Sequence, residues 1–482
     1  MAVFYREGEQ KKRPGIYMRH TNVGYNPVAG AIDGIAAIPI QASWGPLGKV
    51  VKNTRKADLD KNYGKGEYSP TFTVPAAAAI FDGGANTVYT YRMGTGGTAA
   101  TATLKDSASP DGTEAVTITA KYPGTRAFTY TVRNRLGDST QKELLIYDGT
   151  TVVESYTFPV GTTEAADLVA AAADSDNFDF AVVRGYQGTD GLAAAVNEAF
   201  TAGTNPTVQN ADYSTAFAAL EPYYYNTITL DVDDDESLTL SLMLQEYMKN
   251  AYQMGKLGIC VVGEKTDVDF EDRLEHSAAF NDEKVVYLGN GYIDASGNKV
   301  EGVMAICYTA GLIAATPSNQ GITHSIIDGA TDVSESLTYS QYEAAVDAGM
   351  LLLSVSSDGE VWYDTGLTTL VQASDETKDD GWKKIRRVKV RFEMIDRIDR
   401  ELGPKVGRVN CDNDGVADVI QSGQRILDAM VNEHKILSGA SFTEDSDNPH
   451  EADSAWFIIR ADDIDSLEKI YLQYQFRYSQ YA

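Results

Sequence analysis

The sequence is poor in cysteine, in histidine and in long apolar runs. It contains 3 cysteines and 5 histidines among 482 residues, and Cys260, Cys307 and Cys411 lie far apart with no C-x-x-C pair. This spacing argues against a disulfide scaffold or a zinc site, and it predicts buried free thiols in a reducing compartment. The longest apolar run, residues 303–315, is too short to cross a membrane, so we expect a buried helix there.

Positive charge is also scarce. Lys and Arg number 41 against 69 Asp and Glu, which gives a formal net charge of −28. Because a phosphate backbone is held by clustered Lys and Arg, this balance argues against a general nucleic-acid binder. The basic residues within 1–13 are followed by no apolar segment, so we expect no signal peptide.

Catalytic motifs are missing as well. The sequence has no G-x-S-x-G elbow, and residues 262–266, which follow a predicted strand, lack the glycine spacing of a phosphate-binding loop. His450 begins a zincin-like stretch, but Ser454 stands where the second histidine belongs. We therefore predict no catalytic, metal-binding or cofactor-binding residues.

Two acidic stretches can be interpreted as calcium sites or as helix caps. Residues 231–236 contain five acids, and residues 412–415 resemble a calcium loop without the closing glutamate. Both precede predicted helices, where carboxylates accept hydrogen bonds from exposed N–H groups. We expect capping in both cases.

The chain opens with a polar segment, residues 1–30, in which Pro and Gly break any helix and residues 16–20 alternate as a short strand. Residues 32–40 then predict a strand that leaves into a turn. Within this opening, Arg13-Pro14-Gly15-Ile16-Tyr17, Asp33-Gly34-Ile35-Ala36-Ala37-Ile38-Pro39 and Trp44-Gly45-Pro46 resemble the start of contractile tail sheath proteins. These proteins occur in bacteriophages with contractile tails and in phage-tail-like particles. The stretch Lys121-Tyr122-Pro123-Gly124-Thr125-Arg126 is similar to the motif that begins the outermost domain of that family.

Composition and periodicity divide the chain into domains. We expect an extended arm over 1–30 and an α/β core formed by 31–94 together with 206–377. An inserted β-rich domain is expected over 95–205, with short helices at 163–173 and 191–202. Strand, helix and strand alternate from residue 225 to 355, which predicts parallel pairing. A small α+β domain over 378–465 and a C-terminal arm over 466–482 complete the chain.

The terminal stretch has a clear two-residue period. Its apolar side chains fall on one face, whereas Gln473, Gln475 and Arg477 fall on the other. The stretch is either an edge strand of its own domain or a strand donated to a neighbouring copy. Because the small C-terminal domain offers few strands, we favour donation from both arms. The predicted donors are Ile16, Tyr17, Met18, Arg19, Ile470, Leu472, Tyr474, Phe476 and Tyr478. The predicted accepting strand contains Trp456, Phe457, Ile458 and Ile459.

One basic concentration stands out in this acidic chain, near the start of the helix predicted from residue 385. It is either a solvated helix face or a surface that docks on an acidic partner. In the sheath family the C-terminal domain lines the inner tube, so the resemblance makes that tube the expected partner. The residues concerned are Lys383, Lys384, Arg386, Arg387 and Lys389.

The resemblance implies a structural subunit without cofactors, whose core is subtilisin-like in fold but not catalytic. It implies helical assembly with copies of itself around an inner tail tube protein. Baseplate and terminator proteins are the other expected partners, without nucleic acid or membrane insertion. The expected location is a phage tail or tail-like particle assembled in the bacterial cytoplasm. The alternatives are an enzyme with a degenerate hydrolase-like core and a surface adhesin, which the missing export signal disfavours.

Overall fold

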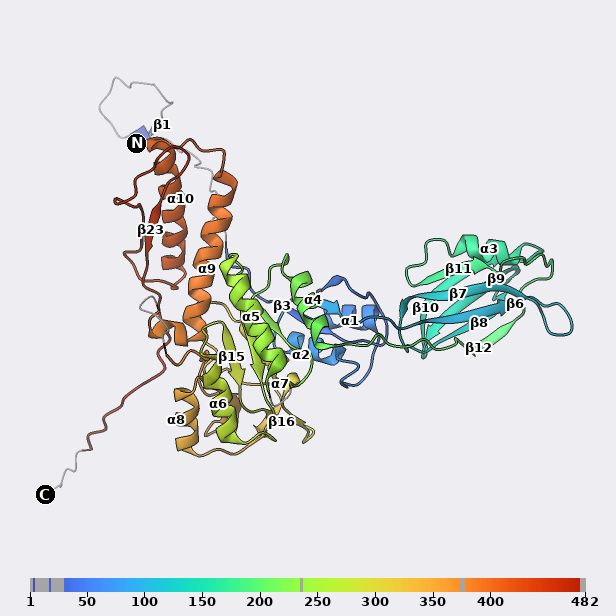
Figure 1. The fold of residues 1–482 in the computed structure, drawn as a ribbon, viewed down its shortest axis with the longest axis horizontal. Helices are drawn as coiled ribbons and strands as arrows, with labels where there is room; N and C mark the ends of the chain where they lie inside the picture. Colours follow the sequence, from blue (N-terminus) through green and yellow to red (C-terminus); the bar gives the residue numbers. More distant parts are fainter. Residues whose placement is uncertain (1–2, 5–16, 19–29, 235–236, 373–377, 477–482) are drawn as a thin grey trace. The chain divides into compact units, whose positions relative to one another are not determined.

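The computed structural model describes residues 3–4, 17–18, 30–234, 237–372 and 378–476 (Figure 1). The chain divides into two compact units. One unit comprises Met1–Ala31 and Met394–Asp462, and the other comprises Ile32–Glu393 and Asp463–Ala482. The larger unit contains an α/β core and a β-sandwich, so the fold is a mixed α/β multidomain architecture.

A seven-stranded sheet forms the core. Its order is β19 (Met350–Leu351), β15 (Val285–Leu288), β14 (Ile259–Gly263), β13 (Thr227–Thr229), β3 (Ile35–Ile40), β5 (Thr87–Arg92) and β4 (Val50–Asn53). Neighbouring strands are parallel throughout, except that β4 is antiparallel to β5. Because β3 pairs with β13, this sheet combines strands from both sides of the sandwich in the sequence. The parallel pairing predicted from the alternation is confirmed.

Helices cover both faces of this sheet, because successive side chains of its strands point to opposite faces. On β3, Ala36 and Ile38 pack into one apolar cluster and Ala37 packs into the other. The Ala37 side carries α4 (Asn210–Leu220), α5 (Thr239–Gln253), α6 (Phe270–Phe280) and α8 (Tyr339–Asp347). The Ala36 side carries α1 (Lys56–Tyr63), α2 (Val74–Asp82) and α7 (Val303–Ala315).

The apolar run predicted as a buried helix is α7, and none of the described helices is long and apolar enough to span a membrane. Both acidic stretches cap helices as expected. Asp234 accepts hydrogen bonds from Leu240 N and Ser241 N at the start of α5. Asp412 accepts one from Gly415 N at the start of α10 (Asn413–Asn432). Among the cysteines, Cys260 and Cys307 are buried, but Cys411 is exposed, so the prediction of a buried thiol is wrong there.

The sandwich packs two sheets around aromatic side chains such as Phe128 and Phe178. One sheet has the order β10 (Thr151–Pro159), β9 (Asp138–Asp148), β8 (Phe128–Arg135) and β12 (Ala195–Ala199). The other has the order β11 (Phe178–Val182), β7 (Glu114–Pro123) and β6 (Ala99–Lys105), and α3 (Glu164–Ala171) packs beside them. The helix predicted over 191–202 is wrong: β12 lies there because pairing with β8 overrides the helix propensity of its alanines.

Residues 350–355, at the end of the alternating region, are divided between two sheets. The Asn290 side chain bonds the backbone N and O of Leu353, so β19 joins the core sheet while β20 (Leu353–Val355) pairs with β21 (Val361–Tyr363). A small sheet of β17 (Lys299–Val300), β16 (Tyr292–Asp294) and β18 (Ala330–Val333) lies within the same unit.

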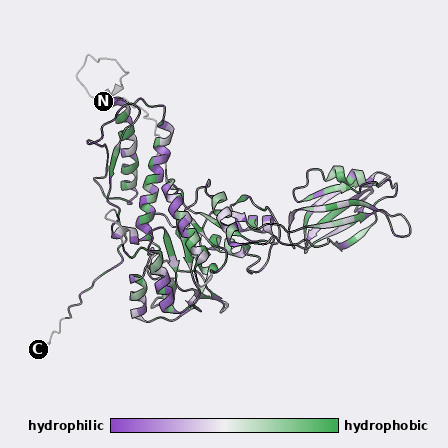
Figure 2. Cartoon of the chain, viewed as in Figure 1, coloured by the Kyte–Doolittle hydropathy of each residue, from purple (hydrophilic) through white to green (hydrophobic). Residues whose placement is uncertain are grey.

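The last part of the chain contains the two predicted helices, α9 (Ile385–Leu402) and α10. Figure 2 shows hydrophilic residues along much of α9. A hairpin of β22 (Ser441–Glu444) and β23 (Phe457–Arg460) follows, and Phe442 of β22 packs against α10 at Gly423. The strand β22 was missed by the sequence analysis. In the N-terminal segment, β1 (Val3–Phe4) pairs in parallel with β2 (Tyr17–Met18).

Helices α2 and α7 pack with very little space between their backbones. A Cβ added at Gly311 would lie 2.0 Å from the carbonyl oxygen of Ile80. Gly311→Ala should therefore lower the free energy of unfolding by about 1–3 kcal/mol, although helix propensity alone would raise it by about 1 kcal/mol. Urea denaturation measures the difference. Gly161→Ala, where no atom lies within 4 Å, is the control expected to be neutral or slightly stabilising. Stabilisation by Gly311→Ala would contradict this packing.

Candidate functional site

The C-terminal arm, residues 464–476, forms no regular strand with the rest of the described chain. Its apolar side chains are exposed: Ile470 by 68%, Leu472 by 68%, Tyr474 by 72% and Phe476 by 94%. The rings of Tyr474 and Phe476 stack with centroids 6.2 Å apart, as expected for two residues on one face of an extended chain. The alternative of an edge strand within its own domain is therefore wrong for residues 470–476. Tyr478 lies outside the described residues.

The arm begins at an ion-pair anchor on α9. Arg387 donates two hydrogen bonds to the Asp463 carboxylate, at 2.7 and 2.8 Å, and Arg391 Nε lies 3.3 Å from the same group. Burial by itself raises the pKa of Asp463, but the hydrogen bonds from both arginines outweigh it and hold that pKa below 3.8. The bidentate geometry is the stronger class of charge-assisted contact.

Two further contacts extend this anchor along the arm. Lys384 Nζ lies 3.0 Å from Asp465 and 2.5 Å from Glu468. Thr323 donates a hydrogen bond to Glu468, and Arg386 donates one to Ser466 at 2.9 Å. The basic concentration found in the sequence thus has its acidic partner within the chain. The signal that could have revealed this partner is the acidic spacing of Asp463, Asp465 and Glu468.

The remaining residues predicted to contact a tube have different surroundings. Lys389 is only 8% exposed and donates to the carbonyl oxygens of Ile313 and Thr316. Lys383 pairs with Asp380 at 3.0 Å, and the Asp380 side chain is 92% exposed. An exposed pair of this kind contributes about 0–1 kcal/mol. Among the residues predicted to contact a tube, Lys383 is therefore the one whose charge is least neutralised by partners within the chain.

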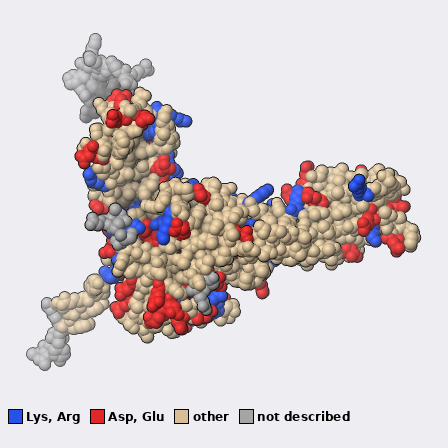
Figure 3. Space-filling view, in the orientation of Figure 1, with Lys and Arg blue, Asp and Glu red and all other residues tan. Residues whose placement is uncertain are grey.

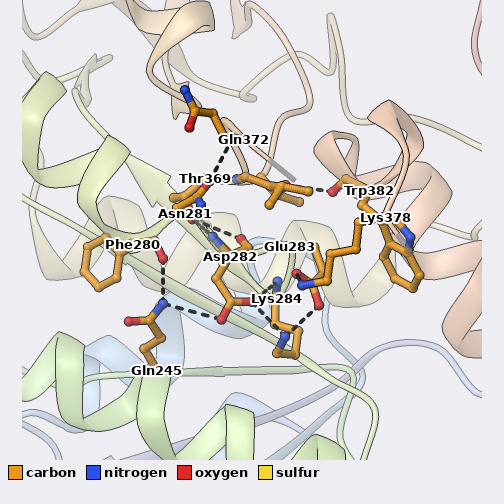
Figure 4. A network of polar contacts seen from close by, with 12 residues as sticks. Gln245, Phe280, Asn281, Asp282, Glu283, Lys284, Thr369, Gln372, Lys378 and Trp382 are labelled. Carbon is orange, nitrogen blue, oxygen red and sulfur yellow. Dashed lines mark hydrogen bonds and ion pairs between the residues drawn. The ribbon is translucent and has the colours of Figure 1, made fainter. Parts of the chain in front are cut away.

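A buried polar network ties the segment before α9 to the core sheet (Figure 4). Lys284 pairs with Asp282 at 2.8 Å and with Glu283 at 2.7 Å, and Lys378 pairs with Glu283 at 2.8 Å. Burial opposes the charge on Glu283, yet its lysine partners lower its pKa. Thr369 adds a hydrogen bond to the carbonyl oxygen of Asp282. Removing one partner of a buried ion pair lowers the free energy of unfolding considerably. This network therefore fixes the segment that leads into α9, and with it the anchor on α9.

The predicted accepting strand lies in the hairpin. Phe457, Ile458 and Ile459 belong to β23, and Trp456 immediately precedes it. In the described chain β23 pairs only with β22, so its other edge pairs with no further strand, whereas the outer edge of β22 is bonded by the Gln424 side chain of α10. Trp456 and Ile459 are 46% and 40% exposed. In the N-terminal arm, Tyr17 and Met18 form β2, whereas Ile16 and Arg19 lie outside the described residues.

The carboxyl edge of the parallel sheet, where ligands commonly bind in such folds, combines a buried carboxylate with an open polar pocket lined mainly by residues of 263–276. Asp231 is fully buried after β13 and accepts hydrogen bonds from Thr73 Oγ1 at 2.6 Å and Tyr213 OH at 2.7 Å. Burial raises its pKa to about 6. The histidine His276 bonds Glu264, at 2.7 Å, rather than a nucleophile.

Across the described residues, no serine or cysteine side chain is hydrogen-bonded to a histidine. The same residues contain no group of three or more His, Cys, Asp or Glu that could hold a metal ion. The arrangement at this edge therefore stabilises the fold, and it brings together no nucleophile and base.

The anchor makes a prediction about arm mobility. A nitroxide at Lys469→Cys, in a Cys411→Ser background, should become more mobile in Arg387→Ala or Asp463→Ala, because each change removes one partner. The double variant should be no more mobile than Asp463→Ala alone, since that change already removes the contacts of Asp463 with both Arg387 and Arg391. Because the pKa of Asp463 is lowered, the anchor should hold above about pH 4 and loosen as the pH falls further.

The control is Arg425→Ala, which removes an exposed pair with Glu401 and should leave the label unchanged. Equal label mobility in Arg387→Ala and in the parent would contradict the anchor.

Comparison with known families finds matches for the α/β core and for the β-sandwich of the larger unit. Residues 207–364 match the phage tail sheath protein central domain, and residues 95–205 match the phage tail sheath protein beta-sandwich domain. Together these matches cover more than half of the chain. The uncharacterized protein YqbK of Bacillus subtilis (strain 168) is 25% identical over 407 residues, covering 83% of this chain and 80% of YqbK.

Solved structures show the same fold. The sheath tail protein from Desulfitobacterium hafniense aligns with a TM-score of 0.69 at 20% identity, covering 93% of this chain and all of that one. The helical sheath of the anti-feeding prophage in its contracted state aligns with a TM-score of 0.55 at 11% identity, covering 96% of this chain and 99% of that one. These neighbours are structural sheath proteins of tail-like particles rather than enzymes. The chain therefore belongs to the contractile tail sheath family.

Proposed function

We propose that this chain is the repeating subunit of a sheath that polymerises as a helical tube around an inner tail tube. Contraction of this sheath drives the tube through a target cell envelope. Family membership supports the proposal, as does the similarity to a helical sheath that has been solved in a contracted state. In this proposal, the mechanical work of contraction comes from changes in the interfaces between copies, and no nucleotide or cofactor takes part.

The observation that carries the proposal is the exposed arm. Four apolar side chains on one face are each at least 68% exposed. A monomer therefore leaves a large apolar surface in contact with water. Burying each of them would contribute about 1.5–3 kcal/mol. In the described chain the β23 edge of the β22–β23 hairpin pairs with no further strand, and a sheet of two strands is marginal by itself. The arm of one copy therefore adds a strand beside β23 of another, with the N-terminal arm strand contributing at the same sheet.

The anchor and the arm have different roles in this connection between copies. Asp463, Asp465 and Glu468 are held on α9, whereas residues 469–476 can span about 26 Å when extended. A connection anchored at one end and paired at the other can follow a rotation of one copy past another. This arrangement lets copies remain linked while the sheath shortens.

The core is, in this proposal, a subtilisin-like fold without catalysis. Its parallel sheet with helices on both faces supports that assignment. The partners beyond other copies are the inner tail tube protein, the baseplate and the terminator. The particle is assembled in the cytoplasm of a bacterial host and ends as part of a phage tail or a tail-like device.

Deleting residues 470–482 tests the donated strand. We expect a folded monomer that forms no tubes, because residues 470–476 pair with no strand of the described chain. Negative-stain microscopy and sedimentation measure assembly, and circular dichroism checks the fold. Leu472→Lys with Tyr474→Lys should also prevent assembly, whereas Gln473→Lys with Gln475→Lys, on the opposite face, should weaken it far less. Tubes of normal length from the deletion would refute the donated strand.

Tube docking through the basic residues of the α9 region makes a separate prediction. Lys383→Glu should weaken co-sedimentation with the inner tube several-fold, because the charge of Lys383 is the least neutralised by partners within the chain. Self-assembly without the tube should be unchanged. Arg425→Glu is the matched control, and equal tube binding by Lys383→Glu and the parent would remove Lys383 from the docking surface.

A further inference from the structure

The two edges of the core sheet carry opposite charge. At the β19 edge, α6, α8 and the loop before α6 present exposed acids, and none of the exposed residues in 267–280 or 339–347 is Lys or Arg. Figure 3 shows these red side chains gathered over α6 and α8. We define the acidic face as the exposed residues Asp267, Asp269, Glu271, Asp272, Glu275, Glu343 and Asp347.

At the other edge, β4 and α1 carry an exposed basic set. We define the basic edge as Lys49, Lys52, Arg55, Lys56, Lys61 and Lys65. Arg55 pairs with Asp58, Lys56 with Asp82 and Lys65 with Asp60, all with substantial solvent exposure. Lys49, Lys52 and Lys61 have no carboxylate within 4.0 Å among the described residues. Such a set is unusual in a chain whose net charge is −28.

The sheet holds these two surfaces apart. α8 and α6 contact β19, the first strand of the sheet, and α1 contacts β4, the seventh. With strands spaced about 4.8 Å apart, the edges are separated by roughly 30 Å. The acidic face and the basic edge therefore cannot neutralise each other within one copy.

We propose that the acidic face of one copy binds the basic edge of a second copy of this chain. The proposal rests on the function proposed above and specifies a second contact between copies, independent of the arms. Because the two surfaces differ, the contact is heterologous, and repeating it produces an open helical array rather than a closed dimer.

Charge supplies the reason for such a contact. Copies that each carry −28 repel one another at long range. Association is then oriented by the places where unlike charges meet, since complementary patches set register and association rate. The anchor uses Lys384, Arg387 and Arg391 within the chain, whereas the basic edge presents its charge outward. The contact should also weaken as salt rises.

Two charge-reversed variants of the full chain test the proposal. The acid-reversed variant is Asp267→Lys with Glu275→Lys and Glu343→Lys, and the base-reversed variant is Lys49→Glu with Lys52→Glu and Lys56→Glu. Each variant alone should assemble at a critical concentration at least tenfold above that of the parent, because like charges then meet. The acid-reversed variant has a smaller net charge, so general repulsion alone would predict easier assembly.

An equimolar mixture of the two variants should assemble near the parental concentration. In alternating copies, the reversed face of one variant meets the reversed edge of the other. This recovery also shows that both variants are folded. The control is Asp111→Lys with Glu114→Lys and Asp179→Lys, three exposed acids of the sandwich, which should assemble like the parent.

Parental assembly by the acid-reversed variant alone would overturn the proposal. So would failure of the mixture when both variants are folded by circular dichroism, or an equal loss in the sandwich control. If the parent itself forms no tubes, the proposed function fails first, and that outcome is distinct from each of these.

Discussion

The arm beyond Glu468 imposes the constraint on which the rest of the structure depends. Residues 470–476 carry exposed apolar side chains at every second position, and they pair with no strand of the described chain. Burial of such a strand requires a sheet edge, and β23 offers one in a hairpin that is itself short of strands. Under the proposed function, the arm of one copy joins the hairpin of another, which supplies the arm with a sheet and the hairpin with a further strand.

Ion pairs within the chain position the arm for this apolar contact. The basic residues of α9 hold the arm at Asp463, Asp465 and Glu468, and the Lys284 network fixes the segment that leads into α9. These charges therefore position the arm, and few of them are left to bind other molecules. The outward charge lies on the core, where the sheet separates acids from bases. In the proposed contact, these surfaces set one orientation for copies that repel one another overall.

The sequence predicted elements whose period is strong and whose partners are local. Alternating strands and helices indicated the parallel core, and helical spacing indicated α9 and α10, whereas the strand predicted from the two-residue period of the arm stays a prediction. The acidic stretches were correctly interpreted as caps, because a cap bonds to a helix only a few residues away. The resemblance to sheath proteins, seen in short stretches such as Trp44-Gly45-Pro46, indicated the family.

The errors arose where distant partners decide the structure. The alanines of β12 favour a helix, but pairing with β8, more than sixty residues away in the sequence, makes them a strand. The strand β22 is short and follows Gly439, and its pairing with β23 is what defines it. The Arg387–Asp463 contact joins residues 76 positions apart, so the basic cluster and the acidic spacing of Asp463, Asp465 and Glu468 could each be seen in the sequence, but their pairing could not.

A helical reconstruction of tubes assembled from the purified chain tests the central claim most directly. The account predicts density for residues 470–478 as a strand beside β23 of a neighbouring copy, with the apolar face turned inward and Asp463 still bound to Arg387 of its own chain. Tubes in which this segment lies unpaired, or folds back onto its own copy, would contradict it.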